Sequence, residues 1–505
     1  MADFLNYGEK RALLEFDSIF KSQWENGFLP HVRYIQGQNS YHPSANLWSS
    51  NHNGLNTSLH YKTSSITQPP LVGYMFELCL KKSKNKTDFL NGLKKYIPQL
   101  HKYHKYLFTH RNYENCIYIL HPWESGLDNS PVFDAPGKNA KNLLIKGGFK
   151  NLLLNRLDTK NVNAKERPSN KDYELYGLLM DFINRPQNHM EKLPPFAFID
   201  VVFNSIYVKS LSSLQYILGM CKEYRITIDD YDVILKQTDN FLLSTLQGVT
   251  KKLYSDTDGC FYCYDIVSNR SIELKTIHNF FPLILKEHLS LEKINKLTKK
   301  FKSYIEGDDT SPVPTNMDQE SFNPHNYWRG PVWPIINWFF IEAFNEKEFK
   351  LYAFLKKQTI ALISEGLGCP QEKIRQLALN LLEFNSYDDY FTTPSKQQYY
   401  HGWLWDSCFA ALGWIHANNI NETFYGTWED IYSQRVLLKS KSYNTSKIKN
   451  LLRKKYSVPM FSEYYASMSD ENYPKDAPLG ADMMTWTASV YLDLIHKDKN
   501  ETNQY

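Results

Sequence analysis

The sequence predicts an all-α protein whose helices close into a toroid, with minor β-hairpin insertions. Apolar residues recur at helical spacing along most of the chain, and alternating runs typical of strands are few. A hydrophobic content of 42%, with 15% aromatic residues, allows a chain of 505 residues to bury a large core. Because barrel folds run long as single units, we expect one domain over residues 1–505.

Composition and charge exclude several classes of partner. The formal net charge is +4, which is close to balance, so we expect no nucleic-acid partner and no membrane surface. The amino terminus lacks the profile of a signal peptide, and no apolar run approaches the roughly 20 residues of a transmembrane helix. Seven cysteines, an odd number without a framework, fit a reducing compartment. The sequence therefore indicates a cytoplasmic protein and leaves its oligomeric state open, a homo-oligomer included.

Near the amino terminus, two expected helices flank a long polar stretch. Leu13 and Phe16 share one face of a helix expected over residues 9–24. Residues 35–64 have almost no periodicity, and we interpret them as a loop that lines a pocket. Gln68, just ahead of the next helix, is a candidate sugar-binding residue because its amide is both donor and acceptor. The alternative is a helix-capping segment with proline in the first turn.

The middle of the chain combines further helices with one hairpin. Helices are expected over residues 88–105, 170–184, 199–220 and 284–304. Residues 257–264 are typical of a short hairpin. Cys260 and Cys263 have the spacing of half a metal site, but no second pair follows at zinc-site spacing. We therefore interpret both cysteines as structural and expect no metal.

Residues 326–334 (NYWRGPVWP) form the central motif, and the apolar run after them predicts a helix packed into the core. Such a motif suits the floor of a sugar pocket, because aromatic faces stack on C–H faces while a guanidinium group binds sugar oxygens. The residues that carry this prediction are Tyr327, Trp328, Arg329 and Trp333. The alternative is a buried aromatic cluster covered by one arginine.

The carboxyl-terminal third contains two more expected helices and a polar segment. Leu351 and Leu355 mark a helix that ends near Gly366, and a second helix begins at Pro370. Residues 421–458, rich in Ser, Lys and Asn, are predicted to be a polar connector. An apolar helix then closes the chain.

Five segments together indicate a family. They are residues 23–31 (QWENGFLPH), 67–70 (TQPP), 121–131 (HPWESGLDNSP), 326–334 (NYWRGPVWP) and 461–465 (FSEYY). In this order they resemble signature blocks of glycoside hydrolase family 63 and its relatives, the mannosylglycerate and glucosylglycerate hydrolases. One short motif would be weak, but five blocks span nearly the whole chain. The resemblance implies an (α/α)6 barrel, the fold of six-hairpin glycosidases.

One further block departs from the family order. In the relatives a Trp-Leu-Trp-Asp-Ser block lies near the amino terminus, whereas here it stands at residues 403–407. We interpret residues 370–420 as the family's first two helices, relocated to just before its last segment. Because the first and last elements of a closed ring are neighbours, the relocated pair could still fill its place. A gene-assembly artefact, or a barrel completed by another protomer, would give the same sequence.

Hydrolysis of a glycosidic bond uses two carboxyl groups, one that protonates the leaving oxygen and one that activates water. By the resemblance, Asp128 corresponds to the general acid and Glu463 to the general base. For Asp128 the alternative is a helix-cap or Asx-turn residue. Glu124 is a third carboxylate nearby, and a swap with Asp128 stays open. Asp388 and Asp389 are rivals for the base, because aromatic residues flank them too.

A substrate-binding wall is expected from residues scattered over four of these blocks. Its members are Gln68, Trp123, Tyr327, Trp328, Arg329, Trp333, Trp403 and Trp405. Arg329 would either meet a substrate carboxylate such as that of glycerate or brace the loop. The resemblance implies an inverting α-glycosidase that acts on a small carbohydrate, such as mannosylglycerate or glucosylglycerate, without a cofactor. The alternatives are an α-glucosidase acting on small glucosides or oligosaccharides and a non-catalytic sugar-binding relative.

Overall fold

The computed structural model describes most of the chain. The described residues are 5–34, 43–48, 61–153, 163–185, 193–305, 313–344, 349–364, 401–417 and 485–501, with the short pieces 156, 159, 461, 464–465, 467–468 and 478–479. The helix expected from Pro370, the connector 421–458 and most of the polar loop 35–64 lie outside these residues.

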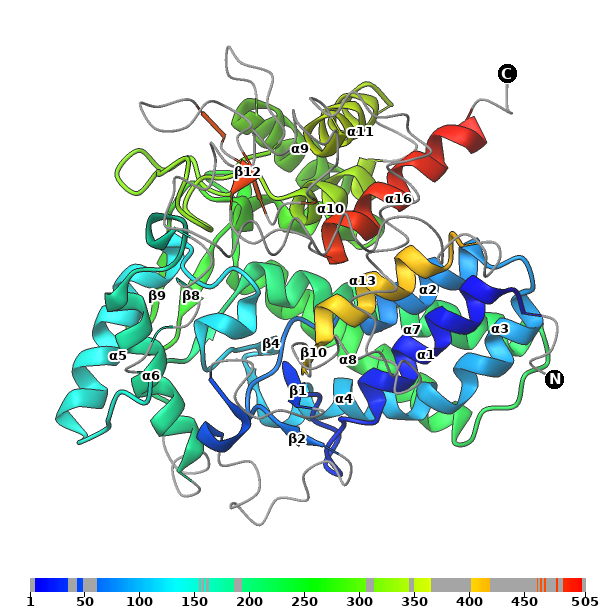
Figure 1. The fold of residues 1–505 in the computed structure, drawn as a ribbon, viewed down its shortest axis with the longest axis horizontal. Coiled ribbons are helices and arrows are strands. Elements are labelled where there is room, and N and C mark those ends of the chain that lie inside the picture. Colours follow the sequence, from blue (N-terminus) through cyan, green and yellow to red (C-terminus); the bar gives the residue numbers. More distant parts are fainter. Residues whose placement is uncertain are drawn as a thin grey trace, which may run out of the picture.

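Helices dominate the structure, as the sequence predicts (Figure 1). The α-helices are α1 (Tyr7–Phe20), α2 (Val72–Lys82), α3 (Lys86–Leu93), α4 (Ile97–His110), α5 (Asp134–Lys146), α6 (Asn170–Asn184), α7 (Val201–Glu223), α8 (Tyr231–Lys252), α9 (Leu291–Ile305), α10 (Pro334–Phe344), α11 (Phe349–Ser364), α13 (Leu404–Trp414) and α16 (Thr485–Glu501). The 3-10 helices are η1 (Ala45–Leu47), η2 (Lys94–Tyr96), η3 (Pro122–Ser125), η4 (Pro131–Phe133), η5 (Ala164–Glu166) and η7 (Ile277–His288).

The strands are short and antiparallel, in agreement with the predicted β insertions. They are β1 (Val32–Tyr34), β2 (Lys62–Thr63), β3 (Asn112–Tyr113), β4 (Cys116–Ile117), β5 (Phe198–Ile199), β6 (Tyr254–Ser255), β7 (Cys260–Phe261), β8 (Cys263–Asp265), β9 (Arg270–Ile272), β10 (His401–Trp403), β11 (Tyr464–Tyr465) and β12 (Pro478–Leu479). The three-stranded sheets have the orders β10-β1-β2 and β5-β8-β9, and β3-β4, β6-β7 and β11-β12 form pairs. The β6-β7 pair confirms the hairpin predicted near residue 258.

Successive contacts close the helices into a ring. Helix α2 packs against α7, α7 against η7, and η7 against α10; α10 then packs against α16, α16 against α13, and α13 against α2. Figure 1 shows α1, α13 and α2 side by side on one flank, with α5 and α6 on the opposite flank. This closed arrangement is the (α/α)6 toroid expected for the chain.

Helix α13 joins parts of the chain that are far apart in sequence. It packs along α1, α16 and α2, and the strand before it pairs with β1, so that Val32 lies opposite Trp403. Residues 401–414 therefore lie beside the first helix and the last one. That position is the one in which a relocated first segment would complete the ring.

Local sequence signals explain most helix boundaries. Helix α6 spans 170–184 as predicted, because Ser169 and Asp172 form a reciprocal capping box at its start. The helices predicted near 88–105 are α3 and α4, and Pro98 stands in the first turn of α4, where its missing N–H costs nothing. The predicted helix 284–304 is divided between η7 and α9.

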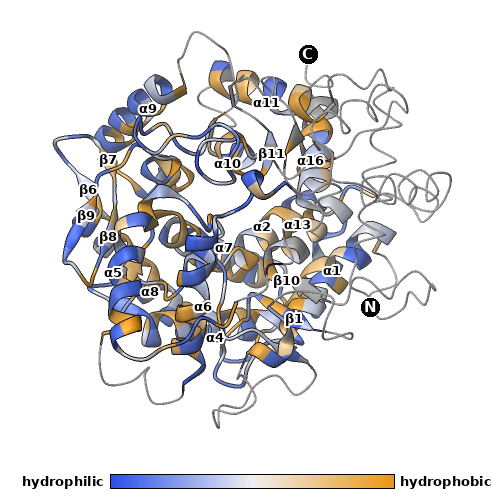
Figure 2. Cartoon of the chain, turned by 60° about the vertical axis from the view of Figure 1, so that its left-hand side comes forward, coloured by the Kyte–Doolittle hydropathy of each residue, from blue (hydrophilic) through white to orange (hydrophobic). Residues whose placement is uncertain are grey.

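Hydropathy follows the same architecture. In Figure 2 the peripheral helices α9 and α11 carry both hydrophilic and hydrophobic residues, whereas α10 is almost entirely buried. This difference is expected for amphipathic outer helices around an apolar inner layer. Within the part of the chain that the structure describes, no helix is long and apolar enough to cross a membrane.

Candidate active site

The loop that carries Asp128 lies between β4 and α5. His121 begins η3 by accepting a hydrogen bond from Trp123 N at its Nδ1, over 3.0 Å. Gly126 ends η3 with a φ of 77°, a left-handed conformation that glycine adopts without strain. Asp128 itself is half-buried, and its carbonyl oxygen accepts a hydrogen bond of 3.0 Å from the hydroxyl of Tyr176 on α6. Short 3-10 turns and side-chain contacts thus position the backbone of this loop.

Glu124, in the same loop as Asp128, is fully buried, and both of its carboxylate oxygens accept hydrogen bonds from the chain. Its Oε2 accepts from Leu120 N at 2.7 Å and its Oε1 from Thr67 N at 3.1 Å. Arg111 adds a two-pronged ion pair, at 3.0 Å to Oε2 and 3.2 Å to Oε1. Because donors of the chain itself engage both of its oxygens, Glu124 fits a positioning role better than proton transfer.

The residue after Asp128 joins this loop to the central motif. Asn129 Oδ1 accepts from Trp328 N at 3.0 Å, and its Nδ2 donates to Asn326 Oδ1 at 2.9 Å. Arg329 Nη1 also donates to the Asn129 carbonyl at 3.3 Å. Asp128 therefore lies where two of the predicted family blocks meet, although about 200 residues separate them in the sequence.

The central motif holds its aromatic side chains in a compact stack. The rings of Trp328 and Trp333 are parallel within 9°, with centroids 3.5 Å apart, and Tyr327 lies edge-on to both. Trp333 has no exposed surface and donates through Nε1 to the Tyr327 carbonyl at 3.1 Å. Tyr327 has a φ of 39°, and Arg167 lies 4.3 Å from its ring centroid. In this arrangement Trp333 lies behind Trp328 and supports it.

Arg329 is engaged by a carboxylate of the chain itself. Its two terminal nitrogens lie 2.9 and 2.7 Å from the two oxygens of Asp134, at the start of α5. Burial alone would lower the pKa of Arg329, but the hydrogen bonds and charge of Asp134 outweigh it and raise that pKa. The structure thus places Arg329 as a brace between the central motif and α5. Contact with a substrate carboxylate stays a prediction.

Trp405 on α13 contacts both Gln68 and the Asp128 loop. Its backbone N donates to Gln68 Oε1 at 3.2 Å and its indole Nε1 to the Pro69 carbonyl at 3.0 Å. A Cβ atom at Gly126 would stand 3.1 Å from the Trp405 ring, so glycine allows this close approach. Segments near residues 68, 126 and 405 therefore form one wall.

Two polar groups of this wall are left for other partners. Oε1 of Gln68 accepts from Trp405 N, but its Nε2 makes no hydrogen bond with any described residue. The indole Nε1 of Trp328 is buried and also has no partner in the described ranges. A buried donor without a partner is costly unless water or a ligand satisfies it.

Several predicted site residues cannot be placed. Glu463, Asp388 and Asp389 lie outside the described residues, as does the side chain of Trp403. Two residues after Glu463, however, Tyr465 exchanges two backbone hydrogen bonds with Val332, of 2.8 and 2.9 Å. The last residue of the block predicted to carry the base is therefore anchored to the central motif.

Trp123 faces the rings of His121 and Tyr176, with ring centroids 4.6 and 5.2 Å away. That the predicted wall residues contact a sugar stays a prediction. The sequence analysis missed Arg111, Tyr176 and Arg167. No local pattern marks them, since each contacts a residue at least 13 positions away in the chain. Burial lowers the pKa of His121 to about 3, with the Tyr176 carbonyl opposing it, so this imidazole is neutral.

Comparison with known proteins identifies the family. Residues 2–374 match the mannosylglycerate hydrolase MGH1-like glycoside hydrolase domain. A mannosylglycerate hydrolase of Thermus thermophilus is 28% identical over 369 residues, covering 70% of this chain and 81% of that protein. A glucosylglycerate hydrolase of Mycolicibacterium hassiacum is 25% identical over 380 residues, covering 69% and 78%.

A solved structure shares the fold over nearly the whole chain. It is the family 63 mannosylglycerate hydrolase of Thermus thermophilus, crystallised with Tris and D-glycerate. The TM-score is 0.63 at 20% sequence identity, with 97% of this chain and 93% of that chain covered. The family match and this fold lead to one conclusion: the chain is a glycoside hydrolase and belongs to the mannosylglycerate hydrolase MGH1-like family.

Proposed function

We propose that this enzyme hydrolyses a small α-glycoside, such as mannosylglycerate or glucosylglycerate, with inversion at the anomeric carbon. Membership of the family and the names of its relatives support this substrate class. The observation that carries the proposal is the position of Asp128. Its loop meets the central motif through Asn129, and the motif in turn holds residues 464–465 through Val332.

In this mechanism Asp128 is the general acid and Glu463 the general base. Asp128 would give its proton to the glycosidic oxygen, and Glu463 would take a proton from the attacking water on the opposite face of the sugar. A separation of about 6.5–9.5 Å between the two carboxyl groups would leave room for that water, and one near 5 Å would indicate retention. Asp388 or Asp389 would take the role of base if Glu463 lay elsewhere.

The residues of the wall around Asp128 suit a ligand that has both polar groups and apolar faces, as a sugar does. We assign sugar contacts to Gln68, Trp123, Tyr327, Trp328, Arg329, Trp403 and Trp405, and support of Trp328 to Trp333. The unengaged Nε2 of Gln68 and Nε1 of Trp328 are donors for sugar hydroxyls. The carboxylate of the substrate's glycerate moiety would bind to cationic or amide donors at the edge of this wall.

The test is a panel of small α-glycosides, including mannosylglycerate, glucosylglycerate and unsubstituted α-glucosides, followed by NMR. Inversion predicts that the β anomer of the released sugar appears first and then mutarotates. If the α anomer appeared first, the reaction would be retaining, and the proposed role of Glu463 in activating the attacking water would be rejected. Hydrolysis of α-glucosides alone would favour an α-glucosidase. Binding without hydrolysis of any member would identify a non-catalytic sugar-binding relative.

We also infer a cytoplasmic location. The six cysteines that the structure describes are all free thiols, which suits a reducing compartment. Cell fractionation with a tagged chain tests this inference, and recovery of the protein outside the cytoplasm would reject it.

A further inference from the structure

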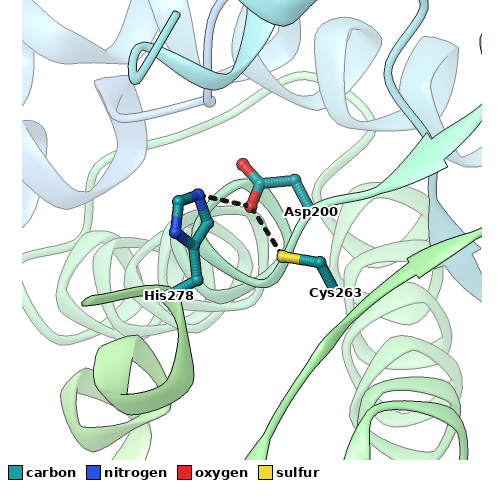
Figure 3. Close-up of side chains that lie close together, drawn as sticks. All are labelled: Asp200, Cys263 and His278. Carbon is teal, nitrogen blue, oxygen red and sulfur yellow. Dashed lines mark hydrogen bonds and ion pairs between the residues drawn. The ribbon is translucent and has the colours of Figure 1, made fainter. Parts of the chain in front are cut away.

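Asp200, Cys263 and His278 converge in the interior (Figure 3). One ligand atom from each lies within 4.8 Å of the other two. Asp200 Oδ1 is 3.5 Å from Cys263 Sγ and 3.5 Å from His278 Nε2. The three side chains are at most 1% exposed, so the cluster is closed to solvent.

Sheet register and helix capping bring these residues together. Strands β5 and β8 pair with Ile199 opposite Tyr264, so the next step of the antiparallel register leads to Asp200 and Cys263. Asp200 then caps α7, accepting from Val202 N at 3.1 Å and from Phe203 N at 3.3 Å. His278 comes from the first turn of η7. Three separate segments thus deliver one donor side chain each.

The polar atoms of this cluster form few hydrogen bonds with one another. Nε2 of His278 is buried and has no hydrogen-bond partner among the described residues. Its other nitrogen, Nδ1, lies 3.2 Å from the Thr276 hydroxyl. When Nδ1 carries the proton and donates it to that hydroxyl, the Nε2 lone pair faces the Asp200 carboxylate. Two electron-rich atoms then face each other in the interior, which is unfavourable unless a cation lies between them or one of them takes up a proton.

We propose that Asp200, Cys263 and His278 bind one divalent cation of the zinc class. A thiolate, an imidazole and a carboxylate are the ligands that zinc prefers, whereas magnesium and calcium prefer oxygen alone. Bonds of about 2.0–2.3 Å in a tetrahedron place neighbouring ligand atoms roughly 3.3–3.8 Å apart. The two distances of 3.5 Å fall within that range.

Charge supports the same assignment. Binding would release the thiol proton of Cys263 to solvent, so a thiolate and a carboxylate would face a doubly positive ion. The sum is zero, which avoids leaving a net charge in the interior. The Thr276 hydroxyl would hold the imidazole by its second nitrogen, as partners of metal-bound histidines generally do. A water would complete the tetrahedron.

The role of this site would be structural. A bound ion would tie the start of α7, strand β8 and the start of η7 together. The ring of His278 lies edge-on to Phe133, 6.3 Å between centroids, and Phe133 ends the short helix that follows the Asp128 loop. The site would therefore support that loop from behind, whatever substrate the enzyme takes.

Metal analysis of the full chain tests this proposal. We expect about one equivalent of zinc per chain after dialysis against zinc and then buffer. Cys263→Ser keeps a hydroxyl donor to Asp200 but removes the thiolate, and its zinc content should fall by about tenfold or more. Cys260→Ser, at a buried cysteine three residues away, is the matched control and should keep its zinc.

A cobalt titration of the metal-free chain provides a second measurement that needs no variant. Thiolate coordination should produce a charge-transfer band in the near ultraviolet.

Zinc should also slow the alkylation of Cys263 in moderate urea, with Cys260 unaffected, as read by peptide mass spectrometry. A wild-type chain that binds no zinc and shows no cobalt band would overturn the proposal, and so would zinc retained by Cys263→Ser. The cluster would then be a hydrogen-bonded contact in which the Cys263 thiol donates to Asp200.

Discussion

At the scale of single residues, Glu124 and Asp128 lie four positions apart in one loop and differ in their surroundings. Glu124 is fully buried and holds an ion pair and two backbone N–H groups, whereas Asp128 is half-buried beside the joint of two motifs. A general acid must reach the leaving oxygen of the substrate, which an enclosed carboxylate cannot do. This contrast favours Asp128 over Glu124 as the proposed acid.

Replacing Asp128 by Asn should lower turnover by about two to four orders of magnitude, because the amide cannot donate the proton that the leaving oxygen needs. Affinity for the sugar should change little, since the side chain keeps its size. Stopped assays give the turnover and calorimetry the affinity. Asp232→Asn, at an exposed position on α8, is the matched control and should behave as wild type. Unchanged turnover in Asp128→Asn would remove this residue from the acid role.

Glu124→Gln should act on stability instead. Arg111 would lose its ionic partner in the interior, and breaking a buried pair by changing one member costs about 3–5 kcal/mol. Urea unfolding measures the loss. The double variant Arg111→Met, Glu124→Leu leaves no unpaired charge and should lose less than Glu124→Gln. A single variant as stable as wild type would show that the pair does not hold the loop.

The protonation of His121 predicts a dependence of stability on pH. Burial lowers its folded pKa to about 3, against roughly 6.5 for an unfolded histidine. The unfolded chain therefore binds the proton first, so the stability contributed by this group is complete above pH about 6.5 and falls as the pH drops towards 3. His104, buried with a pKa of about 3 for the same reason, adds to this loss.

His121→Asn keeps an acceptor for Trp123 N but cannot titrate. Between pH 6 and 5 its free energy of unfolding should fall less than that of wild type, by up to about 1.4 kcal/mol. Urea unfolding at both values of pH makes the comparison. Equal slopes in the two proteins would mean that His121 is not held neutral in the folded chain.

At the scale of elements, one buried carboxylate connects the helices that close the ring. Asp493 on α16 accepts from Trp338 Nε1 on α10 at 2.9 Å and from His416, just after α13, at 3.0 Å. Lys82 at the end of α2 lies 2.9 Å away. Burial alone would raise the pKa of Asp493, but Lys82 and His416 hold it well below its ordinary range. The ionised carboxylate thus fastens α16 to its neighbours.

Asp493→Ala should lower the free energy of unfolding by about 3–5 kcal/mol, because it leaves Lys82 without its buried partner. Amide hydrogen exchange should rise in α13 and α16 before it rises in α7 and α8. Asp229→Ala, at an exposed position before α8, is the control and should leave both measurements unchanged. Uniform exchange across all helices would show that Asp493 stabilises the fold as a whole and does not fasten these elements in particular.

At the scale of the whole molecule, the family match ends at residue 374, while the ring closes through helices after it. Helices α13 and α16 cover apolar faces of α1, α2 and α10. Apolar side chains between residues 404 and 417 and between 488 and 495 are therefore part of the same hydrophobic core as the matched segment. Whether residues 370–420 were relocated within the gene stays a prediction, but their described part lies inside the ring.

A fragment of residues 1–374 should accordingly not fold alone, because it would expose the surfaces that α13 and α16 bury. We expect aggregation, or loss of cooperative unfolding in circular dichroism. Expression together with residues 375–505 should restore a soluble complex with activity. A cooperative monomeric fragment would contradict this prediction and make the carboxyl-terminal helices an accessory layer.

The sequence by itself determined the helical fold, the course of helices such as α6 and the family blocks around Asp128. Periodicity and caps are local signals: the capping box of Ser169 and Asp172, for example, lies within four residues. The family blocks are also local signals, because each is recognised from a few neighbouring residues regardless of its position in the chain.

Only the tertiary structure decided that Arg111 engages Glu124, that Trp405 reaches Gln68 and that Asp200 meets Cys263 and His278. Trp405 and Gln68 are 337 positions apart, and no pattern in the sequence relates them. Such contacts depend on how whole helices pack and which polar groups burial forces into pairs, and burial is a property of the folded chain and not of any segment.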